Sequence, residues 1–145
     1  MEHTSFNLTI LTPEKVFFNG DAAEVVFSTD EGRVGIMAGH APLIASVAEG
    51  IMEILIGEEW KIAAVGQGFG EIAYEKAEFF IDTAEWADDI DAIRAQEALE
   101  RAGQRITSHL SHKEFLRTQA AMNRAMARLK AAKSYTSSIN QEADK

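Results

Sequence analysis

The first 85 residues alternate apolar and polar positions over short stretches. Phe6, Leu8 and Ile10 are separated by single polar residues, and Val16 to Phe18 and Val25 to Phe27 repeat the two-residue spacing. A period of two is typical of strands that bury one face. Turn-forming residues separate these stretches at intervals of roughly 8 to 12 residues, the pattern of a β-sandwich or barrel. The expected strands are 6–11, 15–18, 23–29, 32–36, 43–48, 51–56, 60–65, 68–74 and 78–83.

Beyond this stretch, apolar residues recur every three to five positions, as they do on one face of a helix. Asp88 or Asp89 is expected to cap a helix that begins at Ile90 and ends near His109. Its apolar positions are Ile90, Ile93, Ala98, Ala102, Ile106 and Leu110.

A second helix is expected from about His112 to Lys133. Ser111 and Glu114 have the Ser-x-x-Glu spacing of a capping box, in which each side chain accepts from the backbone amide of the other residue. The apolar stripe of this helix is Phe115, Ala121 or Met122, Ala125 or Met126, Leu129 and Ala132. The connection between the helices is short, so they should pack antiparallel, and their many alanines allow close approach. Because neither helix has a broad face of large apolar residues, this hairpin should be held loosely and be able to move.

These patterns predict an α+β protein, with an all-β N-terminal sandwich of about ten strands followed by an antiparallel two-helix hairpin. The expected boundaries are 1–85 for the sandwich and 86–133 for the hairpin. Residues 134–145 are polar and without periodicity, so they are expected to form a frayed tail.

The chain of 145 residues has no cysteine, which excludes disulfides, thiolate metal sites and cysteine nucleophiles. It has no run of 18 or more apolar residues and no signal peptide, which predicts a cytoplasmic protein without direct membrane insertion. The net charge is −9, divided unevenly into −10 over residues 1–84 and +1 over residues 85–145. Because binding to nucleic acid needs clustered Lys and Arg, no nucleic-acid partner is expected.

The segment from Gly32 to Leu43 holds a single histidine, His40, among small and apolar residues. Gly39 permits a left-handed backbone and Pro42 fixes φ, so the segment should hold His40 at a defined place. No Ser-His-Asp or Cys-His arrangement with a motif spacing accompanies it, so no catalytic residue is expected. On residue type alone, a packed structural histidine and a histidine at a docking surface both remain open.

Two other motifs suggest sites only superficially. The run from Gly66 to Gly70 lacks the Gly-Lys-Ser/Thr of a phosphate loop and precedes an expected strand, so a tight turn between two strands is predicted. His109 and His112 are three residues apart but have no convincing third ligand, so they are expected to be solvated turn residues and not a metal site.

Charged residues are distributed unevenly over the expected hairpin. The acidic ones near its start are Glu85, Asp88, Asp89, Asp91, Glu97 and Glu100, and the basic ones on the second helix are Arg117, Arg124, Arg128, Lys130 and Lys133. An antiparallel hairpin places the acidic start beside the basic end, which helix dipoles favour by about 0.3 to 1 kcal/mol per charge. A structural match of charges and an anion-binding site are both open interpretations of this pattern.

Four motifs in order carry a family resemblance over residues 6–133. They are His40-Ala41-Pro42-Leu43 after a glycine-rich strand, Gly68-Phe69-Gly70-Glu71, Ile90-Asp91-Ala92-Ile93-Arg94-Ala95, and Arg124-Ala125-Met126-Ala127-Arg128. Together they resemble the ε subunit of the bacterial F-type ATP synthase, a subunit of the F1 central stalk. Two residues depart from the family pattern: Ala38 stands where many members have proline, and Arg33 where some have an acidic residue.

The resemblance implies a non-catalytic subunit, not an enzyme. It implies that the sandwich binds the γ subunit and the rotor c-ring, with Arg33, Met37, His40 and Pro42 at the subunit interface. Such a subunit couples ion translocation, of protons or sodium, to ATP synthesis at the α/β catalytic subunits. It would lie peripherally at the cytoplasmic face of the cell inner (plasma) membrane as part of the F1Fo complex.

The resemblance also implies that the hairpin restrains ATP hydrolysis and senses ATP. The residues that match the nucleotide-binding members are Glu85, Asp91, Arg94, Arg124 and Arg128. No cofactor is required, and ATP is the implied regulatory ligand. The alternative is a generic adaptor protein with a sandwich and a helical hairpin and without enzymatic activity, which would share the layout without the ordered motifs.

Overall fold

The computed structural model describes residues 4–106 and 111–143, with side chains described up to Lys133. The chain divides into two compact units, Met1–Trp86 and Ala87–Lys145. Among the described residues, no helix combines the length and the apolar character needed to cross a membrane.

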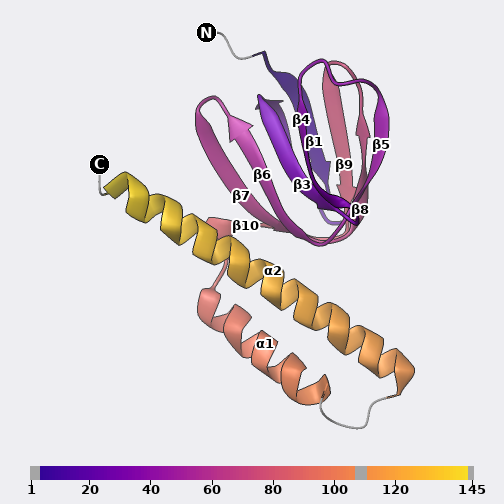
Figure 1. The fold of residues 1–145 in the computed structure, drawn as a ribbon, viewed down its shortest axis with the longest axis vertical. Helices are drawn as coiled ribbons and strands as arrows, with labels where there is room; N and C mark the ends of the chain where they lie inside the picture. Colours follow the sequence, from indigo (N-terminus) through magenta and orange to yellow (C-terminus); the bar gives the residue numbers. More distant parts are fainter. Residues whose placement is uncertain (1–3, 107–110, 144–145) are drawn as a thin grey trace. The chain divides into compact units, whose positions relative to one another are not determined.

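The first unit contains ten strands in two five-stranded sheets (Figure 1). The strands are β1 (Phe6–Leu11), β2 (Val16–Ala22), β3 (Glu24–Thr29), β4 (Gly32–Met37), β5 (Leu43–Val47), β6 (Gly50–Ile56), β7 (Glu59–Val65), β8 (Gly68–Ile72), β9 (Lys76–Ile81) and β10 (Ala84–Trp86). The first sheet has the order β2-β1-β9-β8-β5, and the second sheet has the order β10-β7-β6-β3-β4. β1 and β9 are parallel, and the other described pairs are antiparallel. The predicted sandwich is confirmed.

The core of this unit lies between the two sheets. Phe6, Leu8 and Ile10 are buried, as the alternation in β1 predicts. Phe27 of β3 and Phe79 of β9 meet edge to face across the sheets, with ring centroids 5.1 Å apart. Such a pair adds about 0.5 to 1.5 kcal/mol beyond the burial of its area. The two sheets are therefore joined by large interlocking side chains.

The edges of the sandwich are joined in two different ways. At one edge, Trp86 of β10 stacks on Phe17 of β2, with ring centroids 4.4 Å apart. At the other, residues 38–42 carry the chain from β4 in the second sheet to β5 in the first. This second connection is the segment that contains His40.

The connection between β7 and β8 differs from the expected turn. These strands lie in different sheets, so Gly66 and Gln67 form a crossing and not a turn between paired strands. The N–H of Gly66 donates to the carbonyl of Thr83 at 2.8 Å. A Cβ on Gly68 would collide with the backbone carbonyl of Phe80. A Cβ on Gly66 would collide with the side chains of Asp82 and Thr83, so close approach of a neighbouring segment accounts for both glycines.

The second unit begins with a 3-10 turn, η1 (Ala87–Asp89), which is followed by α1 (Ala92–Ile106) and α2 (His112–Ala143). The expectation that Asp88 or Asp89 caps the first helix is wrong, because Asp89 ends the 3-10 turn. Asp91 is the cap: its Oδ1 accepts from the N–H of Ile93 at 3.0 Å and of Arg94 at 3.1 Å. These bonds satisfy two of the amides that a helix start leaves without partners.

The capping box at the start of α2 is confirmed. Glu114 N–H donates to Ser111 Oγ at 3.2 Å, and Ser111 N–H donates to a carboxylate oxygen of Glu114 at 3.3 Å. The expected tail from Ser134 is wrong, since α2 continues to Ala143. Several polar residues of this stretch are weak helix formers, which is why the sequence pattern suggested an earlier end.

The two helices lie side by side as an antiparallel hairpin (Figure 1). The buried residues are Ala95 and Ala102 on α1 and Thr118, Ala125, Leu129, Ala131 and Ala132 on α2. Thr118 satisfies its hydroxyl by donating to the carbonyl of Glu114 at 2.9 Å. Ile93 was expected on the buried face, but its side chain is 73% exposed. Alanines, and not the larger apolar residues, therefore define the contact face of α1.

Candidate functional site

The segment around His40 is held by backbone bonds and not by a core of its own. Gly39 has φ +81, and its N–H donates to the carbonyl of Tyr74 in the β8–β9 turn at 2.8 Å. A residue with a side chain would be strained at this φ. The N–H of His40 donates to the carbonyl of Met37 at 3.3 Å. The glycine therefore fixes the turn against a neighbouring hairpin.

The ring of His40 is oriented by the turn itself. Its Nδ1 donates to the carbonyl of Ala41 at 2.7 Å, a bond that requires the proton to be on Nδ1. No hydrogen bond to Nε2 occurs among the residues that the structure describes. This arrangement fixes the direction of the ring.

Large apolar side chains surround this turn on the surface. Met37, a predicted interface residue, is 59% exposed, and Pro42 is also exposed. Ile44 is 73% exposed and Tyr74 is 60% exposed, although the sequence did not single them out. Exposed apolar side chains that gather in one place are typical of an interaction surface. The sequence did contain one sign of this surface. Ile44 is an apolar residue at an outward-facing position of its strand, where the next outward-facing residue, Ser46, is polar.

A pocket of about 410 Å³ lies next to the turn, on the first sheet. Its lining residues are Pro42, Leu43, Ile44, Glu71, Ile72, Ala73, Lys76 and Glu78. Glu71 of β8 and Glu78 of β9 are directly opposite each other across the strand pair. The sequence did not identify this pair, because the two residues meet only through the register of β8 and β9.

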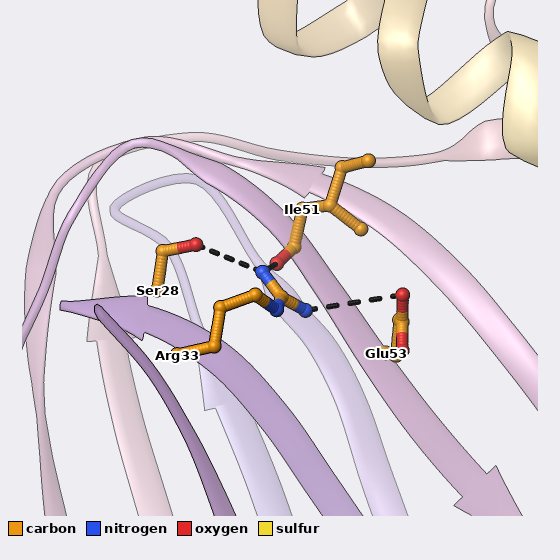
Figure 2. A network of polar contacts seen from close by, with 4 residues as sticks. All are labelled: Ser28, Arg33, Ile51 and Glu53. Atoms are coloured by element: carbon orange, nitrogen blue, oxygen red, sulfur yellow. Dashed lines mark hydrogen bonds and ion pairs between the residues drawn. The ribbon is translucent and has the colours of Figure 1, made fainter.

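Arg33 is predicted at the interface, but in the structure its guanidinium binds within the second sheet (Figure 2). Its Nη1 donates to Ser28 Oγ and to the carbonyl of Ile51, both at 2.8 Å. Its Nη2 lies 3.9 Å from a carboxylate oxygen of Glu53. Arg33 therefore links β4 to β3 and β6.

The pairing of β3 with β6 explains where Arg33 forms these bonds. The β3–β6 pairing ends at Val26 and Glu53, so the carbonyl of Ile51 lies beyond the last described pair. Arg33 supplies a hydrogen-bond donor to this carbonyl, and its planar guanidinium group can donate to several acceptors at once. Arg33 and Met37 stand four residues apart on β4, about 13 Å at the usual rise of a strand. The structure thus joins Met37, His40 and Pro42 in one turn and ties Arg33 to a separate network.

The predicted nucleotide-binding residues are divided between the two units. Asp91, Arg94, Arg124 and Arg128 belong to the hairpin, whereas Glu85 lies in β10 of the sandwich. The side chains of Arg94 and Arg124 are exposed, and Arg128 is half-buried. One oxygen of Asp91 is engaged as the helix cap. Asp91 thus has a structural role as a helix cap, and the nucleotide-binding role of the five residues stays a prediction.

Only one histidine of the His109 and His112 pair lies within the described residues. His112 is the first residue of α2, and His109 lies outside the described residues. Among the residues that are described, no group of three or more His, Asp or Glu is placed to hold a metal ion.

Comparison with known protein families matches both units of the chain. The model described as the β-sandwich domain of the ATP synthase delta/epsilon chain matches residues 5–87. The model described as the long α-helix domain of the same chain matches residues 88–133.

Several relatives and solved structures are similar over most of their length. The ATP synthase epsilon chain of Ruminiclostridium cellulolyticum is 40% identical, with 88% of this chain and 95% of the relative covered. That of Caldanaerobacter subterraneus is 36% identical, with 90% and 96% covered. A chain of the Euglena gracilis mitochondrial ATP synthase shares the fold, with a TM-score of 0.78, 22% identity, and 88% of this chain and 81% of that chain covered. This chain therefore belongs to the ATP synthase delta/epsilon chain family.

Proposed function

We propose that this protein is the non-catalytic ε subunit of the central stalk of an F-type ATP synthase, at the cytoplasmic face of the cell membrane. The observation that carries the proposal is the match of both family domains, in order, over residues 5–133. A chain of similar fold, 13% identical with a TM-score of 0.65, comes from the central stalk and c-ring of the Tetrahymena thermophila mitochondrial ATP synthase. In this role the subunit couples ion translocation to ATP synthesis at the α/β subunits.

The sandwich is the part proposed to bind the γ subunit and the c-ring. Met37, His40 and Pro42 share one turn, which the Gly39–Tyr74 hydrogen bond holds in place. A turn that is fixed before binding loses little conformational freedom when it binds, which favours affinity. Arg33 contributes indirectly in this proposal, by joining the strand that leads into the turn to its neighbours.

The hairpin is the part proposed to restrain ATP hydrolysis. Its buried residues are mostly alanines, so separating α1 from α2 exposes little apolar area. A ligand that binds one hairpin conformation better than another shifts the population by the ratio of its affinities. ATP is the proposed ligand, with Arg94, Arg124 and Arg128 near its phosphates and Asp91 and Glu85 as acceptors from its base or ribose.

Assembly is tested by isolating the tagged full-length chain from its own cells. We expect γ and the other F1 subunits to be recovered with it in fixed proportion. Recovery of the chain alone, as a monomer with a turnover of its own, would rule out the stalk role.

ATP sensing is tested by calorimetric titration of the isolated full-length chain with ATP. We expect saturable binding that is weakened by Arg94→Ala and by Arg124→Ala, because each loses a cation near the phosphates. Lys113→Ala, which removes a positive charge in the first turn of α2, serves as the control. Absence of binding by the unmutated chain would end the ATP-sensing proposal and leave the assembly proposal standing.

A further inference from the structure

The outer face of the first sheet carries ordered rows of side chains. Register places Ile44, Glu71 and Glu78 in one row across β5, β8 and β9. The next row along these strands contains Phe69 and Phe80, whose rings stack with centroids 5.1 Å apart. Side chains two residues apart on a strand share a face, so Glu71 and Glu78 lie beside the two phenylalanine rings on one side, and Lys76 lies two residues from Glu78 on the same face of β9.

The pairing of Glu71 with Glu78 is unfavourable in the free protein. Residues directly opposite in an antiparallel pair have Cβ atoms about 4.5 to 5.5 Å apart, and like charges there are destabilising. No side-chain hydrogen bond or ion pair joins either glutamate to another residue that the structure describes. Lys76, the cation among the pocket residues, is likewise without an ion pair to a described residue. The two carboxylates therefore outnumber the one cation beside them, and neither forms an ion pair with a described residue.

The pocket of about 410 Å³ lies between this acidic pair and the turn that contains His40. Pro42 and Leu43 line it on the side of the turn, and Ile44 is largely exposed. The lining of the pocket is thus apolar where it adjoins the proposed docking turn and acidic at Glu71 and Glu78. This composition distinguishes it from the outer face of the second sheet, where Arg33 and Glu53 lie close enough to offset each other.

We propose that this pocket binds a segment of a stalk partner that presents a lysine or arginine beside a large apolar side chain. The cation lies between Glu71 and Glu78 and removes their repulsion, while the apolar side chain enters the pocket against Leu43 and Ile44. The inference rests on the proposed function, because it takes the partner to be another subunit of the same enzyme. Charge complementarity with the sandwich, which has a net charge of −10 over residues 1–84, favours such a basic segment.

The test exploits two effects of opposite sign. Glu71→Gln and Glu78→Gln remove the repulsion, so each should raise the melting temperature of the full-length chain by about 1 to 3 °C. The same variants should weaken binding to the enzyme complex stripped of this subunit by about tenfold, with a smaller dependence on salt. Glu59→Gln, an exposed carboxylate on β7 of the second sheet, removes the same charge elsewhere and should change neither quantity. Ile44→Ser should weaken binding without lowering the melting temperature.

The outcomes separate this inference from the proposed function. Binding of both glutamine variants within twofold of the unmutated chain would overturn the inference and leave the stalk role intact. A pocket that instead seats a second copy of this chain, seen by light scattering as a dimer that Ile44→Ser dissociates, would also overturn it. Failure of the unmutated chain to bind the stripped complex would overturn both. A higher melting temperature together with weaker, less salt-sensitive binding would establish the pair as a recognition site for a basic segment.

Discussion

The sandwich and the hairpin both bury apolar surface, but they bury side chains of different size. The most deeply buried large side chains, including Phe27, Phe79 and Met52, lie between the two sheets. The hairpin buries mainly alanines, with Leu129 as its largest buried residue on α2. Because the hydrophobic contribution follows the apolar area removed from water, the sandwich should be far more stable than the hairpin. This difference in stability fits a rigid sandwich that binds partners and a hairpin that can change conformation.

The largest expected effect is on the sandwich core. Phe79→Ala should lower the free energy of unfolding by about 3 to 5 kcal/mol, through lost burial and the cavity that remains. Both tryptophans, Trp60 and Trp86, lie in the sandwich, so their fluorescence during urea unfolding measures this unit. Phe69→Ala, at a half-exposed position, is the control, with an expected loss of about 1 kcal/mol or less. Equal losses for the two variants would contradict the placement of the core.

A smaller effect is expected in the hairpin. Leu129→Ala should destabilise this unit by about 2 kcal/mol, at the low end for a leucine because its environment is alanine-rich. Hydrogen exchange of the α1 and α2 amides should accelerate while that of β1 and β9 stays unchanged. Met126→Ala, at an exposed position on α2, is the control. If Leu129→Ala accelerates exchange equally in both units, the two do not open separately.

Arg33 tests whether the second sheet is held by more than its backbone ladder. Arg33→Gln should cost about 1 to 2 kcal/mol in the urea unfolding of the sandwich, because Ser28 and the carbonyl of Ile51 lose a charged donor. Glu53→Gln should cost less than about 1 kcal/mol, since the ion pair is half exposed. Arg33→Lys keeps the charge without the fork. Full stability of Arg33→Lys would mean that charge, and not the forked geometry, matters.

The smallest expected effect distinguishes the two roles of Asp91. Asp91→Ala should cost the hairpin about 1 kcal/mol by removing the cap of α1, whereas Asp91→Asn should retain the cap. Helicity and amide exchange in the first turn of α1 measure this difference. If Asp91 also binds ATP through its charge, Asp91→Asn should weaken ATP binding while leaving the helix intact. Normal ATP binding by Asp91→Asn would assign the residue to capping alone.

The sequence predicted the parts of this fold that depend on local periodicity. The alternation around Phe6 and Leu8 identified a strand and its buried face, and Ser111 and Glu114 identified the start of α2. It missed features that depend on pairing between distant strands, such as the three-residue β10 and the parallel pairing of β1 with β9. A short strand that is stabilised by a neighbouring strand has too few residues to show an alternation of apolar and polar positions.

The residues of the candidate site divide in the same way, into those that a local pattern predicts and those that only strand pairing brings together. His40 and its turn were found because glycine and proline restrict the backbone locally. Glu71 and Glu78 were not, because only the register of β8 and β9 brings them together. The fork of Arg33 also escaped prediction, since it depends on where the β3–β6 pairing ends. On α1, alanine gives no periodic signal strong enough to compete with isoleucine, so exposed Ile93 was assigned to the wrong face.

We propose that the sandwich assembles the enzyme and that the hairpin regulates it. The most direct measurement compares ATP hydrolysis and ion-driven ATP synthesis by complexes reconstituted with the full chain or with a chain ending at Trp86. We expect the shortened chain to restore assembly and synthesis, with ATP hydrolysis rising above the level of the full-length complex. Unchanged hydrolysis after removal of the hairpin would contradict the proposal.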